Sequence, residues 1–177
     1  MTANNKQIYQ ANFSEKKLFF NRKKIKYWLN EMSEWLFCTQ RKYQDYHYFQ
    51  QKEEELNALL IQLLMAEQFT KEEATAIAST FFADCVELHQ VLSNDLDAIF
   101  EFDPAAKSKQ EVLIAYPGFY AITVHRIAHR LWNKKARIVA RLMSEYAHSK
   151  TGIDIHPSAT IGEHILIDHG TGIEIGE

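Results

Sequence analysis

The feature that most constrains the fold is a six-residue repeat of aliphatic residues in the last 25 positions of the chain. Such a repeat is typical of a parallel β-helix, in which short strands make flat faces, branched side chains stack inward and glycines turn the corners. An amphipathic α-helix does not explain it, because six residues rotate a side chain by about 240° around an axis of 3.6 residues per turn. The repeat consists of two series, Ile155, Ile161, Ile167 and Ile173, and, two positions ahead, Ile153, Ala159, Ile165 and Thr171.

The distribution of glycine indicates where the architecture changes. None of the six glycines precedes Gly118, and five of them follow residue 150. We therefore expect a mainly α fold, with an α-helical domain over residues 1–150 and the start of a β-helix over residues 151–177. A β-helix needs about three or more stacked repeats to bury its faces. The coil is thus expected to be truncated at Glu177, with its final segment poorly anchored.

Before residue 150 the apolar residues recur three and four positions apart, which places them on one face of an α-helix. Residues 116–118, Tyr-Pro-Gly, should break this pattern, and a further helix is expected over about 119–132. Three apolar stripes should face a common core. They are Ile25, Trp28, Leu29, Met32, Trp35 and Leu36, then Leu56, Leu59, Leu60, Leu63 and Leu64, and then Ala74, Ile77, Ala78, Phe81, Cys85 and Leu88.

Two helix starts carry the signature of a capping box. Thr70 is followed three positions later by Glu73, and Ser108 is followed by Glu111 at the same spacing. In such a pair the hydroxyl accepts from the backbone N–H of the glutamate, and the carboxylate accepts from the N–H of the capping residue. We expect helices to begin at both places.

Composition argues against several classes of function. The formal net charge of −3 and the pI near 6.2 provide no general attraction to nucleic acid or to an anionic membrane. The first 12 residues lack the basic start and apolar core of a secretory signal. No apolar stretch approaches the roughly 20 residues that a membrane helix needs. Cys38 and Cys85 are isolated from each other, 47 positions apart, so we expect reduced packing residues and a cytoplasmic protein.

Several segments resemble the serine O-acetyltransferases, a family of hexapeptide-repeat acyltransferases. The resemblance covers roughly residues 75–177 and comprises the N-terminal helical domain and the start of the catalytic domain. Its most specific part is the run Asp-His-Gly-Thr-Gly at 168–172. The other matching segments are Asp95-Leu96-Asp97-Ala98, Asp103-Pro104-Ala105, Tyr116-Pro117-Gly118-Phe119, His125-Arg126-Ile127-Ala128-His129-Arg130-Leu131-Trp132, Ile153-Asp154-Ile155-His156-Pro157-Ser158-Ala159 and Ile161-Gly162.

The resemblance implies a left-handed β-helix that trimerises, with trimers often pairing through their helical domains. It also implies acetyl transfer from acetyl-CoA, a co-substrate and not a bound cofactor, to the hydroxyl of L-serine. The product would be O-acetylserine for cysteine biosynthesis. The groups that bind CoA and the serine carboxylate are expected beyond Glu177, as is a C-terminus that could bind cysteine synthase, so we expect the isolated chain to be inactive.

The resemblance also assigns roles to four residues. His169 would be the general base, since an imidazole has a pKa near the operating pH. Asp154 would orient that imidazole, and Asp103 and Asp168 would hold the ammonium group of serine. Asp154 and His169 are 15 residues apart, so we expect them on successive turns of the coil but not directly stacked.

Simpler interpretations stand beside these roles. His169 taken alone is more typical of a solvated loop histidine than of a general base, and only its place in the six-residue repeat favours the base. Asp103, which precedes a proline, is equally typical of a turn. His125 and His129 have a spacing that zinc sites use, but no carboxylate or cysteine pattern completes a ligand set. A packed pair is favoured and no metal is expected. The basic run over residues 16–26 is more typical of a solvated helix face than of a nucleic-acid site.

Two other functions stay open at this point. The chain could be a helical assembly module whose β-helix start is inert, or a hexapeptide acyltransferase with another acceptor, such as a sugar or a different amine or alcohol. Protection by serine or CoA separates the first from the enzyme, and a comparison of acceptors separates the second.

Overall fold

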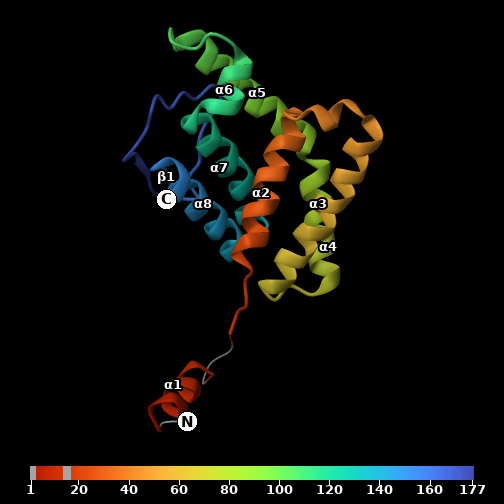
Figure 1. Ribbon diagram of the computed structural model, residues 1–177, viewed down its shortest axis with the longest axis vertical. Helices are drawn as coiled ribbons and strands as arrows, with labels where there is room; N and C mark the ends of the chain where they lie inside the picture. Colours follow the sequence, from red (N-terminus) through yellow and green to blue (C-terminus); the bar gives the residue numbers. More distant parts are fainter. Residues whose placement is uncertain (1–2, 14–16) are drawn as a thin grey trace.

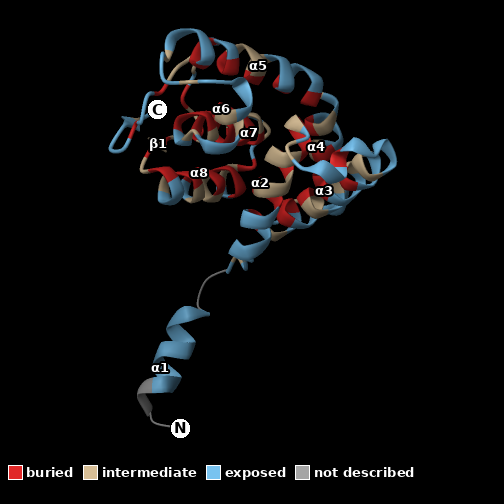
Figure 2. Ribbon diagram, turned by 45° about the horizontal axis from the view of Figure 1, so that its top comes forward, coloured by how far each residue is buried: buried red, intermediate tan, exposed pale blue. Residues whose placement is uncertain are grey.

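The computed structural model describes residues 3–13 and 17–177, which form a mainly helical body and an extended C-terminal segment (Figure 1). Helices α2 to α8 pack together, whereas α1 lies apart from them (Figures 1 and 2). The predicted mainly α class is confirmed. No helix within the described residues has the length and apolar character needed to cross a membrane. The elements are α1 (Ala3–Asn12), α2 (Arg22–Phe37), a 3₁₀ helix (Arg41–Gln44), α3 (Tyr46–Ala66), α4 (Lys71–Ala83), α5 (Cys85–Phe102), α6 (Lys109–Ala115), α7 (Pro117–Asn133), α8 (Arg137–Thr151), β1 (Asp154–Ile155) and β2 (Glu174–Ile175).

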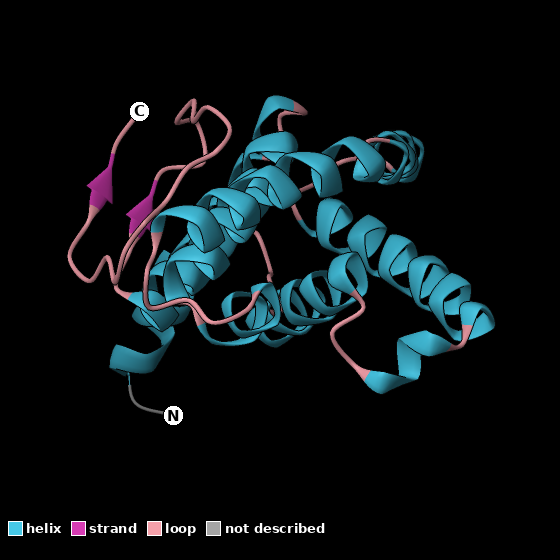
Figure 3. Ribbon diagram, turned by 90° about the horizontal axis from the view of Figure 1, so that it is seen from above, coloured by secondary structure: helices cyan, strands magenta, loops and turns pink. Residues whose placement is uncertain are grey.

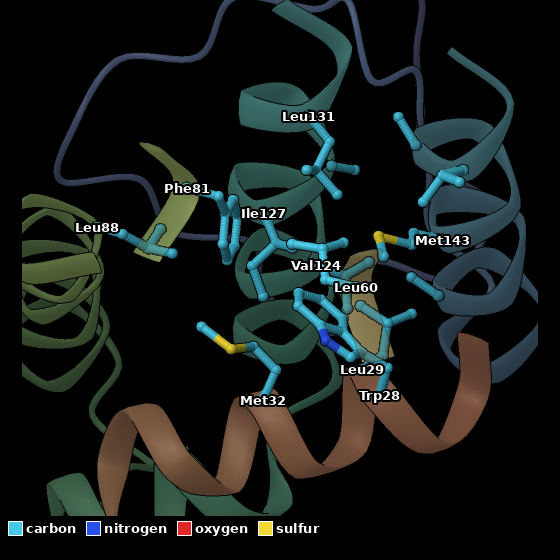
Figure 4. Close-up of a cluster of buried hydrophobic side chains, with 14 of the residues drawn as sticks. Trp28, Leu29, Met32, Leu60, Phe81, Leu88, Val124, Ile127, Leu131 and Met143 are labelled. Atoms are coloured by element: carbon cyan, nitrogen blue, oxygen red, sulfur yellow. The ribbon is translucent and has the colours of Figure 1, made fainter. Parts of the chain in front are cut away.

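The three predicted stripes supply much of the main core. Trp28 of α2 is fully buried, its indole N–H donates to the carbonyl of Leu56 at 2.8 Å, and its ring centroid lies 5.7 Å from that of Phe81. Figure 4 shows these rings pointing toward Ile127 of α7 and Met143 of α8. The predicted common core is therefore confirmed, and α8, which has no counterpart among the stripes, closes it.

Helix α7 is the central element of the body. Between Gly118 and Ala128 every residue except Tyr120 is buried. Pro117 stands at its first position, where the missing N–H costs nothing, and α6 ends two residues earlier at Ala115. The predicted break and the helix after it are both confirmed.

One of the two predicted capping boxes forms completely. Thr70 and Glu73 exchange both hydrogen bonds, at 3.2 and 2.8 Å. Ser108 accepts from the N–H of Glu111 at 3.1 Å, but the Glu111 carboxylate accepts from the N–H of Lys107 at 2.9 Å. The reciprocal half of this second prediction is wrong, because the extended backbone of Ser108 (φ −159°, ψ 155°) leaves the preceding N–H facing the carboxylate.

The third predicted stripe does not lie on one continuous helix. Helix α4 ends at Ala83 and α5 begins at Cys85, with Asp84 between them at φ −79° and ψ −4°. A ψ near zero opens the helical turn and redirects the chain. Phe81, Cys85 and Leu88 nevertheless remain buried in the main core, so the apolar spacing was informative about burial but not about continuity.

Residues 153–177 consist of two short strands and the loops around them, on one side of the helices (Figure 3), and they pack into the core with residues of α7 and α8. β1 and β2 pair in parallel, with Asp154 opposite Glu174 and Ile155 opposite Ile175. Four members of the six-residue repeat are buried, two are partly buried, and Thr171 and Ile173 are exposed. The buried members are Ile153, Ile155, Ala159 and Ile167, and the partly buried ones are Ile161 and Ile165.

A truncation in the main core should be far more costly than one on the surface. Phe81→Ala should lower the free energy of unfolding by about 3–5 kcal/mol, because it removes a fully buried ring and leaves a cavity. Val86→Ala, on the adjoining helix but 82% exposed, should change it by less than about 0.5 kcal/mol. Urea unfolding followed by circular dichroism measures both, and equal losses would contradict the described core.

Candidate functional site

The start of α7 lies directly against the C-terminal segment. A Cβ placed on Gly118 would come within 2.1 Å of the carbonyl oxygen of Ile167. Only a residue without a side chain permits this approach. Gly118 therefore sets the position of Ile167, and with it the next two residues, Asp168 and His169.

A buried ion pair fixes the preceding part of the segment. Arg126 of α7 donates from Nε and Nη2 to the two carboxylate oxygens of Asp95 on α5, at 2.5 and 2.9 Å. The same guanidinium donates to the carbonyls of Gly162, at 2.7 Å, and Ile161, at 3.4 Å. Asp95 also accepts from the N–H of Ile165 at 3.1 Å. Two helices and one extended segment thus meet in one hydrogen-bonded cluster around the Asp95–Arg126 ion pair.

The two histidines of α7 contribute to packing and hydrogen bonding. Nδ1 of His129 lies 2.9 Å from the carbonyl of Pro157, and its Nε2 lies 3.0 Å from Nδ2 of Asn133. A carbonyl can only accept, so Nδ1 donates and Nε2 accepts from the amide. His125 is buried beside it, and burial lowers its pKa to about 4, assisted by His129 and Arg126. Within residues 3–13 and 17–177, no three potential metal ligands gather.

Three of the four predicted site residues come together around a tyrosine. Asp103 ends α5, and its carboxylate accepts from the N–H of Ala105 at 2.8 Å. That bond, a hydrogen bond from Tyr116 and the nearby His169 lower the pKa of Asp103. The same bond to Asp103 raises the pKa of Tyr116 to about 12, and the charge of Asp168 adds to this effect. Asp103 is therefore ionised at neutral pH.

Asp168 and His169 lie at the open side of this cluster. Nε2 of His169 is 3.6 Å from Oδ1 of Asp168, and the two side chains are 95% and 67% exposed. His169 has a φ of 50°, a left-handed conformation that few residues other than glycine adopt. An exposed imidazole beside carboxylates can accept a proton from a bound hydroxyl.

Asp154 lies elsewhere, on β1. Its Oδ2 is 4.0 Å from Nδ1 of His148, and its Oδ1 is buried without a hydrogen-bond partner. Among the described residues the structure thus places no contact between Asp154 and His169. The turn that carries His169 points this imidazole toward solvent. The assigned role of Asp154 stays a prediction.

The sequence did not reveal the structural roles of three residues that build the site. They are Tyr116, Gly118 and Asp95, which forms the ion pair with Arg126. Gly118 carried a usable signal, because a glycine inside a helical pattern often has a packing reason. Arg126 carried another, as a charged residue on an otherwise apolar helix face. No sequence signal connected Tyr116 with Asp103.

Comparisons with known proteins agree with this architecture. Residues 44–124 match a family model described as "Serine acetyltransferase, N-terminal". The chain is 46% identical over 106 residues to the plasmid serine acetyltransferase of Synechococcus elongatus. The aligned region makes up 60% of this chain and 33% of that protein. It is 50% identical over 88 residues to the Bacillus subtilis serine acetyltransferase, and this region makes up 50% of this chain and 41% of that protein. The chain therefore spans between a third and about two-fifths of the length of these relatives.

Solved structures give the same result for the fold. Serine acetyltransferase isoform 3 of Entamoeba histolytica, in complex with cysteine, superposes with a TM-score of 0.79 at 29% identity, covering 92% of this chain and 57% of that one. Serine acetyltransferase 1 of the same organism, in complex with L-cysteine, superposes with a TM-score of 0.78 at 28% identity. The superposition covers 97% of this chain and 66% of that one. Fold and sequence thus relate the chain to enzymes that transfer acetyl groups. The chain is thus similar to serine acetyltransferases in sequence and in fold, which confirms the resemblance found in its motifs.

Enlarging Gly118 should release the C-terminal segment from the helices. Gly118→Ala should cost about 1–3 kcal/mol, because the methyl group overlaps the Ile167 carbonyl and the segment has to move. Gly162→Ala is the control, since no atom lies within 4 Å of its added Cβ. Amide hydrogen exchange should quicken over 161–170 in the first variant only. Unchanged protection there would show that the close approach is not required.

The buried His125 should make stability depend on pH. Its folded-state pKa of about 4 lies below the ordinary 6.5, so the unfolded chain binds more protons between these values. Its contribution is complete above pH 6.5 and is lost as the pH falls toward 4, by about 3 kcal/mol in all.

Urea unfolding between pH 7 and 4 tests this. His125→Gln should flatten the decline relative to the parent chain, whereas His47→Gln, an exposed site on α3, should leave it unchanged. Parallel pH profiles for the parent chain and His125→Gln would show that the imidazole is not the titrating group.

Proposed function

We propose that the chain is the helical domain and the beginning of the catalytic domain of a serine O-acetyltransferase. The reaction would transfer the acetyl group of acetyl-CoA to the hydroxyl of L-serine and give O-acetylserine for cysteine biosynthesis. The observation that carries the proposal is the cluster in which Asp103 and Tyr116 lie near Asp168 and His169. Relatives named serine acetyltransferases add support.

In the proposed domain division, residues 1–150 form the helical domain and residues 151–177 begin a left-handed parallel β-helix. The parallel pairing of β1 with β2 supports this, because strands that follow each other in such a coil pair in parallel. The buried Ile153, Ile155 and Ile167 also support it.

The proposed serine site uses two carboxylates. Asp103 is ionised at neutral pH and Asp168 lies near the same tyrosine, so an ammonium group between them would gain charge-assisted hydrogen bonds. Tyr116 would hold Asp103 in place through its hydroxyl. The serine hydroxyl would then face His169. Two Entamoeba histolytica relatives with cysteine bound show that an amino acid of this size binds to proteins of this fold.

In the proposed reaction His169 removes the proton from the serine hydroxyl as its oxygen attacks the carbonyl carbon of the thioester. The tetrahedral intermediate collapses, the C–S bond breaks, and the CoA sulfur takes up the proton from His169. Asp154 would orient the imidazole and stabilise its protonated form. Groups beyond those of residues 1–177 would bind CoA and the serine carboxylate.

The remaining parts of the proposal concern assembly and setting. We propose a homo-oligomer built on a trimer, or on a dimer of trimers, and cysteine synthase as a further partner. Exposed apolar side chains on α5, Phe100 and Phe102, offer surface for association. The free thiols of Cys38 and Cys85 agree with a cytoplasmic setting.

A chimera tests the reaction. Residues 1–177 are continued with the remaining catalytic residues of the Bacillus subtilis relative, and O-acetylserine is quantified with serine and acetyl-CoA. His169→Asn should lower kcat by about 10²–10⁴, because the proton acceptor is lost. His164→Asn, also exposed in the same segment, is the matched control and should keep the rate.

Each other result has a defined meaning. Full activity of His169→Asn would remove His169 as the base. Transfer to homoserine or an amino sugar in preference to serine would indicate another acceptor. A defined oligomer in sedimentation that neither serine nor CoA stabilises would favour an assembly module.

A further inference from the structure

A recess lies among α2, α6, α7 and α8. Its volume is about 360 Å³, within the range of small-molecule sites. None of Asp103, Tyr116, Asp168 and His169 lines it. Its walls combine a cation, a carboxylate, an amide and several apolar side chains.

The cation of the recess has no acidic partner. Lys150, in the last turn of α8, holds its ammonium 3.9 Å from the ring centroid of Tyr120. Within residues 3–13 and 17–177 no carboxylate lies within ion-pair distance of it, and the side chain is exposed. A cation held over an aromatic ring without a counter-ion is suited to bind a carboxylate.

The opposite charge comes from α2. Glu34 lines the same recess and is 3.3 Å from Lys42, with 29% of its side chain exposed. Asn30 stands one helical turn earlier, and its Oδ1 accepts only a long hydrogen bond, 3.4 Å, from the hydroxyl of Tyr120. A carboxylate and an amide oxygen one turn apart can both accept from an ammonium group.

The rest of the recess is apolar. Phe37 and Phe119, whose ring centroids are 5.6 Å apart, form one part of the wall. Ile114 of α6 lines it too and is 67% exposed, an unusual position for a large aliphatic side chain. An apolar group seated here would cover Ile114, which is favourable at roughly 25 cal/mol for each Å² removed from water.

We infer that this recess binds a free amino acid with an apolar side chain, of the kind of leucine or phenylalanine. Its carboxylate is bound by Lys150, its ammonium by Glu34 and Asn30, and its side chain by Ile114 and the neighbouring aromatic rings. This site is separate from the proposed serine site and does not depend on it.

Amide chemical-shift titration of the chain with L-leucine and L-phenylalanine tests the inference. Saturable shifts are expected at Asn30, Ile114 and Lys150. 3-Phenylpropionate lacks the ammonium and 2-phenylethylamine lacks the carboxylate, so both should bind at least tenfold more weakly than phenylalanine. Equal affinity of either analogue would overturn the assignment of the group it lacks.

Two substitutions and a control sharpen the test. Lys150→Met and Ile114→Ser alter exposed positions, so both variants should fold, and each should weaken binding at least fivefold. Lys71→Met, an exposed lysine of α4 outside the recess, should bind as the parent chain does. Absence of saturable shifts in the parent chain, or unchanged affinity in Lys150→Met, would sink the inference.

A last variant separates this site from the proposed serine site. Asp103→Asn should leave leucine binding unchanged while weakening any shifts that serine produces at Asp103, Tyr116 and His169. Leucine shifts confined to these three residues, and lost in Asp103→Asn, would place the ligand at the serine site and contradict a separate recess.

Discussion

The arrangement of the C-terminal segment depends on the ion pair between Arg126 and Asp95. Asp95 is fully buried and Arg126 nearly so, and burying two charges is expensive unless their remaining donors and acceptors are satisfied. Here the backbone of Ile161, Gly162 and Ile165 supplies those partners. The pair therefore does not merely join two helices. It is complete only when the extended segment is in place, so helix packing and the course of residues 161–165 are coupled.

This coupling explains how so little strand structure keeps a defined course. β1 and β2 have two residues each, and an isolated pair of strands is at best marginally stable in water. The segment instead contacts α7 at three successive points: Pro157 at His129, Gly162 at Arg126, and Ile167 at Gly118. Helix α7 thus positions the coil through these three contacts, and it places Asp168 and His169 near the end of α5.

Periodicity predicted what depends on local spacing. The core faces of α2 and α3, the break before α7 and the change of architecture near residue 150 all follow from which residues recur at three, four or six positions. The turn at Asp84 did not follow, because Cys85 and Leu88 would be buried on either a bent or a continuous helix. The tyrosine beside Asp103 did not follow either. The two residues are brought together by the fold of α6 between them, and the choice of a side-chain partner is set by tertiary placement.

Asp154 remains a candidate for the site although the expected contact with His169 is not formed. Its Oδ1 is buried with no donor in the part of the chain that the structure describes, and such an oxygen costs about 1–3 kcal/mol relative to a satisfied one. The imidazole of His169 is 95% exposed, and Asp168, whose carboxylate lies 3.6 Å from it, is 67% exposed. A histidine that acts as a general base takes up the proton on one ring nitrogen. A carboxylate that accepts a hydrogen bond from the N–H of the other ring nitrogen fixes the required tautomer. The unsatisfied oxygen of Asp154 is therefore the physical reason to keep it in the proposed site, although the imidazole of His169 now faces solvent.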